Sequence, residues 1–540
     1  MRKDLLSWLL LAVWIFFFRP NGIELALGFA VMIIVPLTMR VLLRHSNTSI
    51  RFYDQMLKKL NDWIICFSIA GLLALSLSEV WLALGFALIW VAATVVIALH
   101  GFSQLALKGF RDAEEVLIYI GCIYLAVGGG WFLLSIGKAS SFLHYSQTII
   151  DLTAVHFHYS AFVLPIVCGM LGRSLRRMGS SMKSFPLLAT GIIAGPILVA
   201  LGIELGPPVE PILVLVYIFF VFWFALITIA YGLSLKGFKR VGLILSSLIL
   251  MTTMVLSYLY SAGLAWAPVR LTIPDMVRYH GMANAFGFAL IALWTWNALA
   301  PKNLHSVPLV PVSSLRGAKY VQDKLLVNAS VKQTDALIDS WETYTNKHFD
   351  STKLAPLVAE FHEQTHLFTM EAEVQWHKPF KWVQKPIRLL TKKMKQLHIP
   401  THHAAMDGMI YTVLDDMNGR PQSNVWIRRT KEGEPIFTAA YSSHIREGIR
   451  YNNIGLPLPG GIMTGVLMPK NDEHNGLLLL GDGGSGDAGV YLSFGSFTMR
   501  TPIEETLHLI QVNSTTLRAN HRLKVLGLSF VTLDYTIIKN

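Results

Sequence analysis

The chain has 540 residues, of which 53% are hydrophobic and only 15% are charged, and its mean hydropathy is +0.47. Soluble domains carry about 25% charged residues, so this composition excludes a purely soluble protein and indicates a membrane protein in whole or in part. The net charge of +12 does not indicate nucleic-acid binding, because the Lys and Arg residues are spread along the chain and form no single basic block.

Residues 1–300 are almost continuous apolar runs, which predict ten membrane-spanning helices. Most of these runs reach the length of about 20 residues that the hydrocarbon core requires. The first run, LLSWLLLAVWIFFF, is short and resembles the core of a signal peptide. We count it as a span because RPNG follows it, where a cleavable signal has small residues. The predicted spans are approximately residues 5–18, 22–43, 62–78, 80–99, 116–136, 148–171, 186–203, 211–233, 242–266 and 276–299.

The positive charges in the loops predict the orientation of these spans. Cytoplasmic loops of membrane proteins carry an excess of Lys and Arg. With an internal N-terminus, the inner loops carry fourteen such residues and the outer loops and adjacent span ends carry four. We therefore expect a multi-pass cell-membrane protein with an even number of spans and both termini in the cytoplasm. The inner residues are Arg40, Arg44, Arg51, Lys58, Lys59, Lys108, Arg111, Arg173, Arg176, Arg177, Lys183, Lys236, Lys239 and Arg240; the outer ones are Arg19, Lys138, Arg270 and Arg278.

All three cysteines, Cys66, Cys122 and Cys168, lie within apolar segments. At such positions cysteine behaves as a small buried hydrophobic residue. The sequence therefore supports neither a disulfide framework nor a zinc site built on cysteine.

The composition changes after Pro301. Residues 301–314 form a Pro-rich linker in this interpretation, and residues 315–540 form a soluble cytoplasmic domain. Helical patterns run through DALIDSWETYTNKHF and LAPLVAEF, whereas FTMEAEVQWH alternates apolar and polar residues from Phe368 and predicts a half-buried strand. Short strands separated by turn signals follow. The predicted fold is thus an α-helical multi-pass membrane bundle followed by a cytoplasmic α+β domain with an antiparallel β-sheet.

The segment PFKWVQKPIRLLTKKMKQLHIP mixes basic residues with Trp, Leu, Ile and Met. Such a composition is typical of a helix that lies along an anionic membrane surface. An ordinary surface helix of the soluble domain explains it equally well, and the sequence leaves both alternatives open.

The stretch FHEQTH, residues 361–366, fits the H-E-x-x-H pattern of zinc peptidases. That pattern requires two histidines one helical turn apart with a glutamate as general base, and His362, Glu363 and His366 have the spacing. The strand pattern begins two residues after His366, however, and no further ligand of the extended signature follows. We therefore favour a helix end with exposed histidines over a metal site at His362 and His366. A metal site would need a third ligand, for which Glu371 or Glu373 is the candidate.

Two spans carry ionisable groups, which are costly inside a membrane and usually face the interior of the bundle. The sixth contains Asp151, His156 and His158, and the tenth contains His280 and Asn284. The predicted topology places both sets in the outer half of the membrane. On helices, His156 and His280 can face each other with Asn284 beside them, whereas His158 points away from His156, towards the side of Asp151.

Three interpretations of these residues remain open. His156 and His280 bind a haem or a metal as neutral imidazoles, with Asn284, His158 and Asp151 as further candidates for the site. Alternatively, the same groups line a proton or substrate path, as in a transporter. The third interpretation is that they form interhelical hydrogen bonds and stabilise the bundle.

The stretches LTAVHFHYSAF in the sixth span, RYHGMANAFGF in the tenth and FTMEAEVQW in the soluble part together resemble the YndJ-like family of Bacillus and its relatives. The resemblance covers nearly the whole chain and implies an uncharacterised cell-membrane protein. It supplies no catalytic residues. The leading hypothesis is a membrane protein with a His-lined polar site that binds a metal, a haem or a small solute, and a soluble domain that acts as a sensor or contacts lipid. A transporter is the second hypothesis, and a membrane-tethered zinc hydrolase the third.

Overall fold

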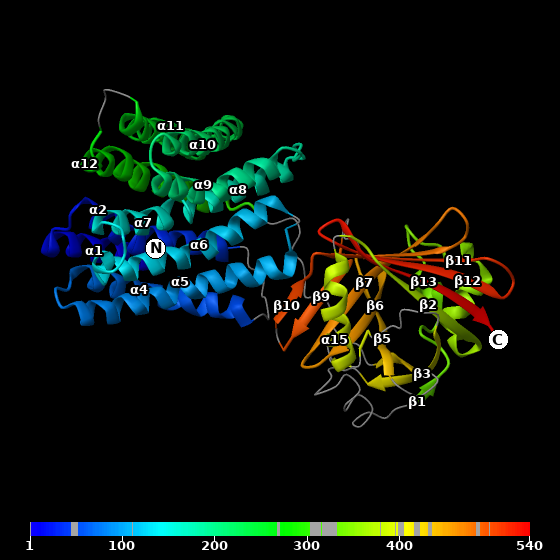
Figure 1. Cartoon of the computed structure of the whole chain (residues 1–540). Helices are drawn as coiled ribbons and strands as arrows, with labels where there is room; N and C mark the ends of the chain where they lie inside the picture. The colour runs from blue at the N-terminus through cyan, green and yellow to red at the C-terminus, as the bar shows by residue number, and fades with distance from the viewer. Residues whose placement is uncertain are drawn as a thin grey trace. The chain divides into compact units, whose positions relative to one another are not determined.

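The computed structural model divides the chain into two compact units, a helical unit and a sheet unit, which are described separately (Figure 1). Most of the predicted linker, residues 303–314, lies outside the residues that the structure describes. The described residues are 2–44, 52–110, 112–266, 271–302, 315, 332–378, 380–394, 396–397, 404–414, 422–429, 435–481, 486–495 and 497–540.

The helical unit is a bundle of membrane-spanning helices, as the sequence predicts. Within the described residues, nine helical segments are long and apolar enough to cross a membrane, and they match the second to the tenth predicted span. The first predicted span forms a shorter apolar helix. The helices are α1 (Arg2–Phe18), α2 (Gly22–Phe29), α3 (Val35–Leu43), α4 (Phe52–Ser76), α5 (Val80–Lys108), α6 (Ala113–Ile136), α7 (Gln147–Tyr159), α8 (Val163–Arg177), α9 (Phe185–Leu205), α10 (Val209–Leu233), α11 (Gly237–Ala265), α12 (Ile273–Asp275) and α13 (Leu290–Leu299).

The helix α1 lies within the bundle although it is only 17 residues long. Its Asp4 pairs with Arg40 at the far end of the second span, so the two helices run antiparallel. Near its other end the indole N–H of Trp14 donates to Ser76 across 2.7 Å. The helix therefore extends along nearly the full length of the second span, and its exposed side chains, such as Leu9 and Phe16, are apolar.

The sixth span is not one continuous helix but two, α7 and α8, separated by Ser160–Phe162. The break has a local cause, because Pro165 has no N–H to donate to the carbonyl of Ala161 and its ring clashes with that carbonyl in a regular helix. The carbonyl of His156 accepts three hydrogen bonds at this point. Their donors are the hydroxyl and the backbone N–H of Ser160 and the backbone N–H of Ala161. The interruption thus comes directly after the two histidines of this span.

Two other spans contain π-helical segments, which are rare and are frequently found at functional sites. One is η1 (Ala30–Ile34), between α2 and α3 in the second span. The others are η3 (Met276–Gly281) and η4 (Ala283–Ala289), which contain His280 and Asn284 in the tenth span. The helix α2 packs against both α7 and η3. The helix α2, which precedes η1 in the second span, therefore lies beside both segments that contain the candidate histidines.

Buried ion pairs fasten α6 to α8. The guanidinium of Arg173 donates to both carboxylate oxygens of Glu115, at 2.6 and 2.8 Å, and Arg176 binds Glu114 in the same two-pronged way. A glycine permits this approach, because a Cβ at Gly169 would lie 2.5 Å from the carbonyl of Glu114. The two helices thus meet at backbone distance where the charges are paired.

The sheet unit consists of one antiparallel sheet with 13 described strands, in the order β10-β9-β7-β6-β5-β4-β3-β2-β13-β12-β11-β8, with β1 beside β3. Because β8 pairs with β7 as well as with β11, the sheet curves round and closes on itself. The strands are β1 (Lys332–Thr334), β2 (Phe368–Trp376), β3 (Ala404–Leu414), β4 (Gln422–Arg429), β5 (Pro435–Arg446), β6 (Ile449–Leu458), β7 (Gly461–Asn471), β8 (Leu477–Leu480), β9 (Gly489–Phe494), β10 (Phe497–Arg500), β11 (Ile503–Gln511), β12 (Thr516–Val525) and β13 (Leu528–Lys539).

The local predictions for this unit are confirmed in two places and wrong in one. The strand β2 starts at Phe368 and buries Met370 and Ala372 while Glu371 and Glu373 are exposed. The helix predicted in LAPLVAEF is α14 (Pro356–Glu363). The helix predicted in DALIDSWETYTNKHF is absent. The only helical part of this described segment is the short 3-10 turn η5 (Trp341–Tyr344), and the aromatic side chains of the segment pack into the core of the sheet unit.

Candidate functional site in the helical unit

His280 in η3 is held by helix α11. Its Nδ1 lies 2.8 Å from the carbonyl oxygen of Thr253, and since a carbonyl only accepts, Nδ1 carries the proton and donates. The neutral ring therefore presents its lone pair at Nε2. Asn284, one turn along, places its amide nitrogen 3.4 Å from this atom, while its Oδ1 accepts from the hydroxyl of Thr253 at 2.9 Å.

The bond from Asn284 to His280 is long for a hydrogen bond, and it is correspondingly weak. In this arrangement the amide N–H of Asn284 faces Nε2 of His280 while its Oδ1 lies 2.9 Å from the hydroxyl of Thr253. Nε2 of His280 is therefore a hydrogen-bond acceptor that stays available to a stronger electron-pair acceptor.

His156 in α7 has the same tautomer. Its Nδ1 donates to the carbonyl of Leu152 across 2.7 Å, which leaves the lone pair on Nε2. Other helices of the bundle leave the side chain exposed, and it is close enough to His280 to interact with it electrostatically. Within the part of the chain that the structure describes, Nε2 of His156 has no hydrogen-bond partner.

His158 is placed differently, although it is only two residues from His156. It is fully buried, and its two ring nitrogens are both occupied: Nδ1 donates to Ala154 at 2.8 Å and Nε2 accepts from the indole of Trp90 at 3.3 Å. Gly128 makes room for the ring, since a Cβ there would lie 3.1 Å from Nδ1. These contacts are those of a structural histidine.

Asp151 is also turned away from His156. Its Oδ1 accepts from the hydroxyl of Ser135 and from the amide of Gln147, each at 2.7 Å. The structure thus brings together His156, His280 and Asn284 out of the five residues that the sequence suggests for this site. It directs His158 and Asp151 towards α5 and α6.

Two neutral imidazoles with unprotonated Nε2 atoms, one of them only weakly hydrogen-bonded to Asn284, can bind an electron-pair acceptor, which is a metal ion, a haem iron or a hydrogen-bond donor. Histidines that bind metals usually donate the other ring N–H to a carbonyl or carboxylate, and both His156 and His280 do so. The described residues contain no group of three or more His, Cys, Asp or Glu side chains that could hold a metal. A metal here would take the remaining ligands from elsewhere, as haem iron does from its porphyrin.

The two histidines of FHEQTH do not share a helical face. α14 ends at Glu363, and the backbone of Gln364 leaves the helix before His366. His362 is buried, donates from Nδ1 to Val358 and packs edge-on against Trp341, contrary to the expected exposure, whereas His366 is exposed. Glu363 accepts from the backbone N–H of Trp341, so the arrangement that the zinc motif requires does not form.

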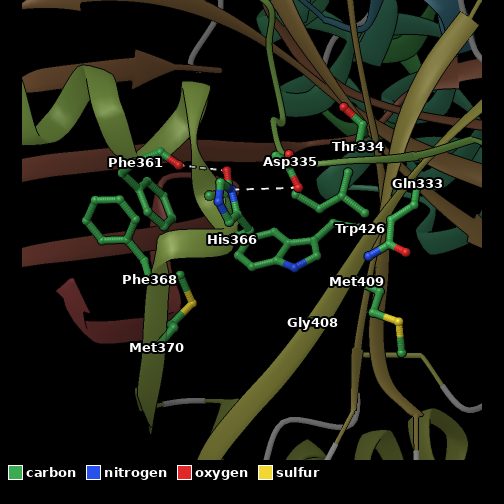
Figure 2. Close-up of a pocket in the computed structure, with 12 residues that line it drawn as sticks. Gln333, Thr334, Asp335, Phe361, His366, Phe368, Met370, Gly408, Met409 and Trp426 are labelled. Atoms are coloured by element: carbon green, nitrogen blue, oxygen red, sulfur yellow. Dashed lines mark hydrogen bonds and ion pairs between the residues drawn. The ribbon is translucent and has the colours of Figure 1, made fainter. Parts of the chain in front are cut away.

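His366 instead borders a cavity of about 70 Å³ in the sheet unit. Figure 2 shows His366 facing Asp335, 3.8 Å away, beside the indole of Trp426. Sequence reasoning missed Asp335 and Trp426, because they belong to segments distant in the chain that only the closed sheet brings together. The volume corresponds to about two water molecules.

Sequence reasoning also missed a second polar cluster in the bundle. The carboxylate of Asp54 in α4 accepts a hydrogen bond from Gln104 in α5 at 2.8 Å, and Nδ1 of His100, also in α5, lies 2.9 Å from the same carboxylate; all three side chains are buried. All three residues lie outside the predicted spans 62–78 and 80–99. The bond from Gln104 to Asp54 joins α4 to α5.

Comparisons with known proteins agree with the architecture. A family model described as YndJ-like protein matches residues 25–288. The chain is 33% identical over 484 residues to the "Uncharacterized membrane protein YndJ" of Bacillus subtilis (strain 168), and the match covers 88% of each chain. No solved structure matches the chain.

Proposed function

Since this chain belongs to the YndJ-like family of membrane proteins, we propose that it is a multi-pass cell-membrane protein that binds a metal ion, a haem or a small solute between His156 and His280. One observation carries the proposal. Each of the two imidazoles donates through Nδ1 to a backbone carbonyl, which leaves its Nε2 unprotonated, and the two rings lie close enough to interact electrostatically.

The metal or haem is the first ligand class to test, because it leaves a signature on the purified protein. The full chain is purified in mild detergent and examined for a Soret band and for bound transition metals by mass spectrometry. We expect one equivalent of a haem or metal, which His156→Ala and His280→Ala each remove. His144→Ala is the matched control, since His144 lies in an exposed turn.

A wild-type protein with neither a Soret band nor bound metal would overturn the metal and haem assignment. The small solute would then remain, with Asn284 and Nε2 of His280 as hydrogen-bonding groups. Thermal-shift screening of solutes against the wild type and His280→Ala tests that class, and a stabilising solute must lose its effect in the variant.

A transporter that uses the same groups as a relay is the second candidate. It is favoured by the break after Tyr159 and the π-helical segments in the second and tenth spans, because interrupted helices near the middle of the membrane are typical of transporter binding sites. Proton flux in liposomes, followed with an entrapped pH-sensitive dye, should be abolished by His156→Ala. Flux that persists in the variant would rule out the relay.

The proposed topology has ten crossings with both termini in the cytoplasm. The charges of the loops support it. The Asp4–Arg40 pair supports it as well, because it places the start of α1 beside the far end of the second span. Reactive tags at the two ends should be labelled only after the inner face is opened. A C-terminal tag that is labelled in intact cells while the N-terminal tag is protected would show an odd number of crossings.

A further inference from the structure

We propose that the helix α15 (Gln384–Met394), with the turn η8 (Phe380–Val383) before it, binds the headgroup region of an anionic lipid membrane. The inference settles on the lipid alternative for this segment and goes beyond the binding site in the helical unit. It relies on the proposed topology only for the leaflet that it names, which is the cytoplasmic one.

The charge of this segment has one sign. Between residues 377 and 397 the sequence has seven Lys or Arg residues and no Asp or Glu. All those whose side chains the structure describes are exposed. Anionic lipids attract such a segment. The described basic residues are Lys378, Lys381, Lys385, Arg388, Lys392 and Lys393.

The same segment exposes large apolar side chains along one line. Trp382, Pro386 and Leu389 follow the spacing i, i+4, i+7, which places them on one face of a helix. The side chains of Trp382 and Leu389 are 76% and 72% exposed, and Leu390 beside them is 55% exposed. Exposure of such an apolar ridge to water is unfavourable. The ridge fits the boundary between the lipid headgroups and the acyl chains.

The opposite face fastens the helix to the sheet. At the start, the ring of Phe380 packs edge-on against Phe530 of β13, with 5.2 Å between centroids. At the end, the buried amide of Gln396 donates to the carbonyls of Thr438 and Pro457, both at 2.9 Å, and accepts from the N–H of Thr438. The sheet therefore holds the helix at both ends and presents the apolar ridge outward.

The composition of the ridge favours lipid over a protein partner. Protein interfaces are depleted in lysine, whereas lysines that flank an apolar ridge extend their ammonium groups to phosphates while their stems lie on the apolar layer. The unit is also tethered, because 32 residues separate α13 from β1, a span of at most about 100 Å. A membrane surface is therefore always within reach of this helix.

The test uses the full chain in lipid nanodiscs. Cys66, Cys122 and Cys168 are replaced by Ala, and a single Leu389→Cys carries an environment-sensitive fluorophore. We expect a blue-shifted emission in discs that contain phosphatidylglycerol, and a return towards the aqueous spectrum in pure phosphatidylcholine or at high salt. The matched control is Leu526→Cys, equally exposed in the β12–β13 turn, whose emission should not depend on the lipid.

A second variant separates charge from fold. Replacing Lys385, Arg388, Lys392 and Lys393 by Gln leaves the Gln396 and Phe380 anchors intact and should abolish the blue shift of the 389 label. An aqueous emission of that label in both kinds of disc would overturn the proposal. A blue shift that persists in phosphatidylcholine and in detergent would also overturn it, because it would show docking onto protein. Ligand binding at His156 is unaffected by any of these results.

Discussion

The indole N–H of Trp90 donates to Nε2 of His158 across 3.3 Å in the interior of the bundle. This bond gives His158 a structural partner on the face of α7 that the sequence predicts to point away from His156. His158 uses both ring nitrogens on its neighbours, whereas His156 uses only Nδ1 among the described residues and lies close enough to His280 to interact with it electrostatically. His156, which makes fewer contacts with its neighbours than His158, is therefore the better candidate for ligand binding.

His158→Leu should destabilise the bundle without a specific effect on ligand binding. It leaves the indole N–H of Trp90 buried without an acceptor, which costs about 1–3 kcal/mol. His156→Ala removes an exposed ring and should change stability by about 0.5 kcal/mol or less. Unfolding in mixed detergents measures both, and equal losses of stability would contradict the assignment of roles.

The pair Thr253 and Asn284 should show a measurable coupling. The hydroxyl of Thr253 bonds the amide of Asn284 across two helices, and such bonds in membranes average about 0.6 kcal/mol. A double-mutant cycle with Thr253→Val and Asn284→Ala measures the coupling from the free energy of unfolding. Additive effects of the two substitutions would show that the bond does not hold α11 to the tenth span.

Glu115→Gln should be strongly destabilising. Glu115 is buried and Arg173 is nearly so, and the substitution removes the carboxylate that pairs directly with the guanidinium, at a cost of about 3–5 kcal/mol. The double variant Glu115→Leu, Arg173→Leu should recover most of the loss, since it removes both charges. The free energy of unfolding of the three variants checks this, and a double variant no more stable than Glu115→Gln would contradict it.

The stability of α14 should depend on pH through His362. Burial lowers the pKa of His362 to about 4, whereas in an unfolded chain it is about 6.5. Between these values the unfolded state binds one more proton, so stability falls as the pH falls from about 6.5 to about 4, by about 3 kcal/mol in all. Above pH 7 the group has no effect.

Hydrogen exchange of the α14 amides in the full chain, corrected for intrinsic rates, measures this dependence. His362→Phe keeps an aromatic ring against Trp341 and should flatten the profile between about pH 4 and 6.5, the range that these two pKa values define. An unchanged slope in the variant would assign the pH dependence to other groups.

Much of the local structure follows from the sequence. Hydropathy identifies nine spans within the described residues, and alternation identifies β2 from Phe368, because burial in lipid or on one face of a sheet constrains each residue type directly. The family follows from the sequence as well, since 33% identity extends over most of the chain.

The tertiary structure alone decides which polar groups meet. Periodicity places His156 and His158 on opposite faces of α7, but it does not say which face meets Trp90 and which meets the tenth span. It shows neither the break after Tyr159 nor the end of α14 before His366. Hydropathy and spacing are properties of one segment, whereas the donor to Nε2 of His158 belongs to another helix.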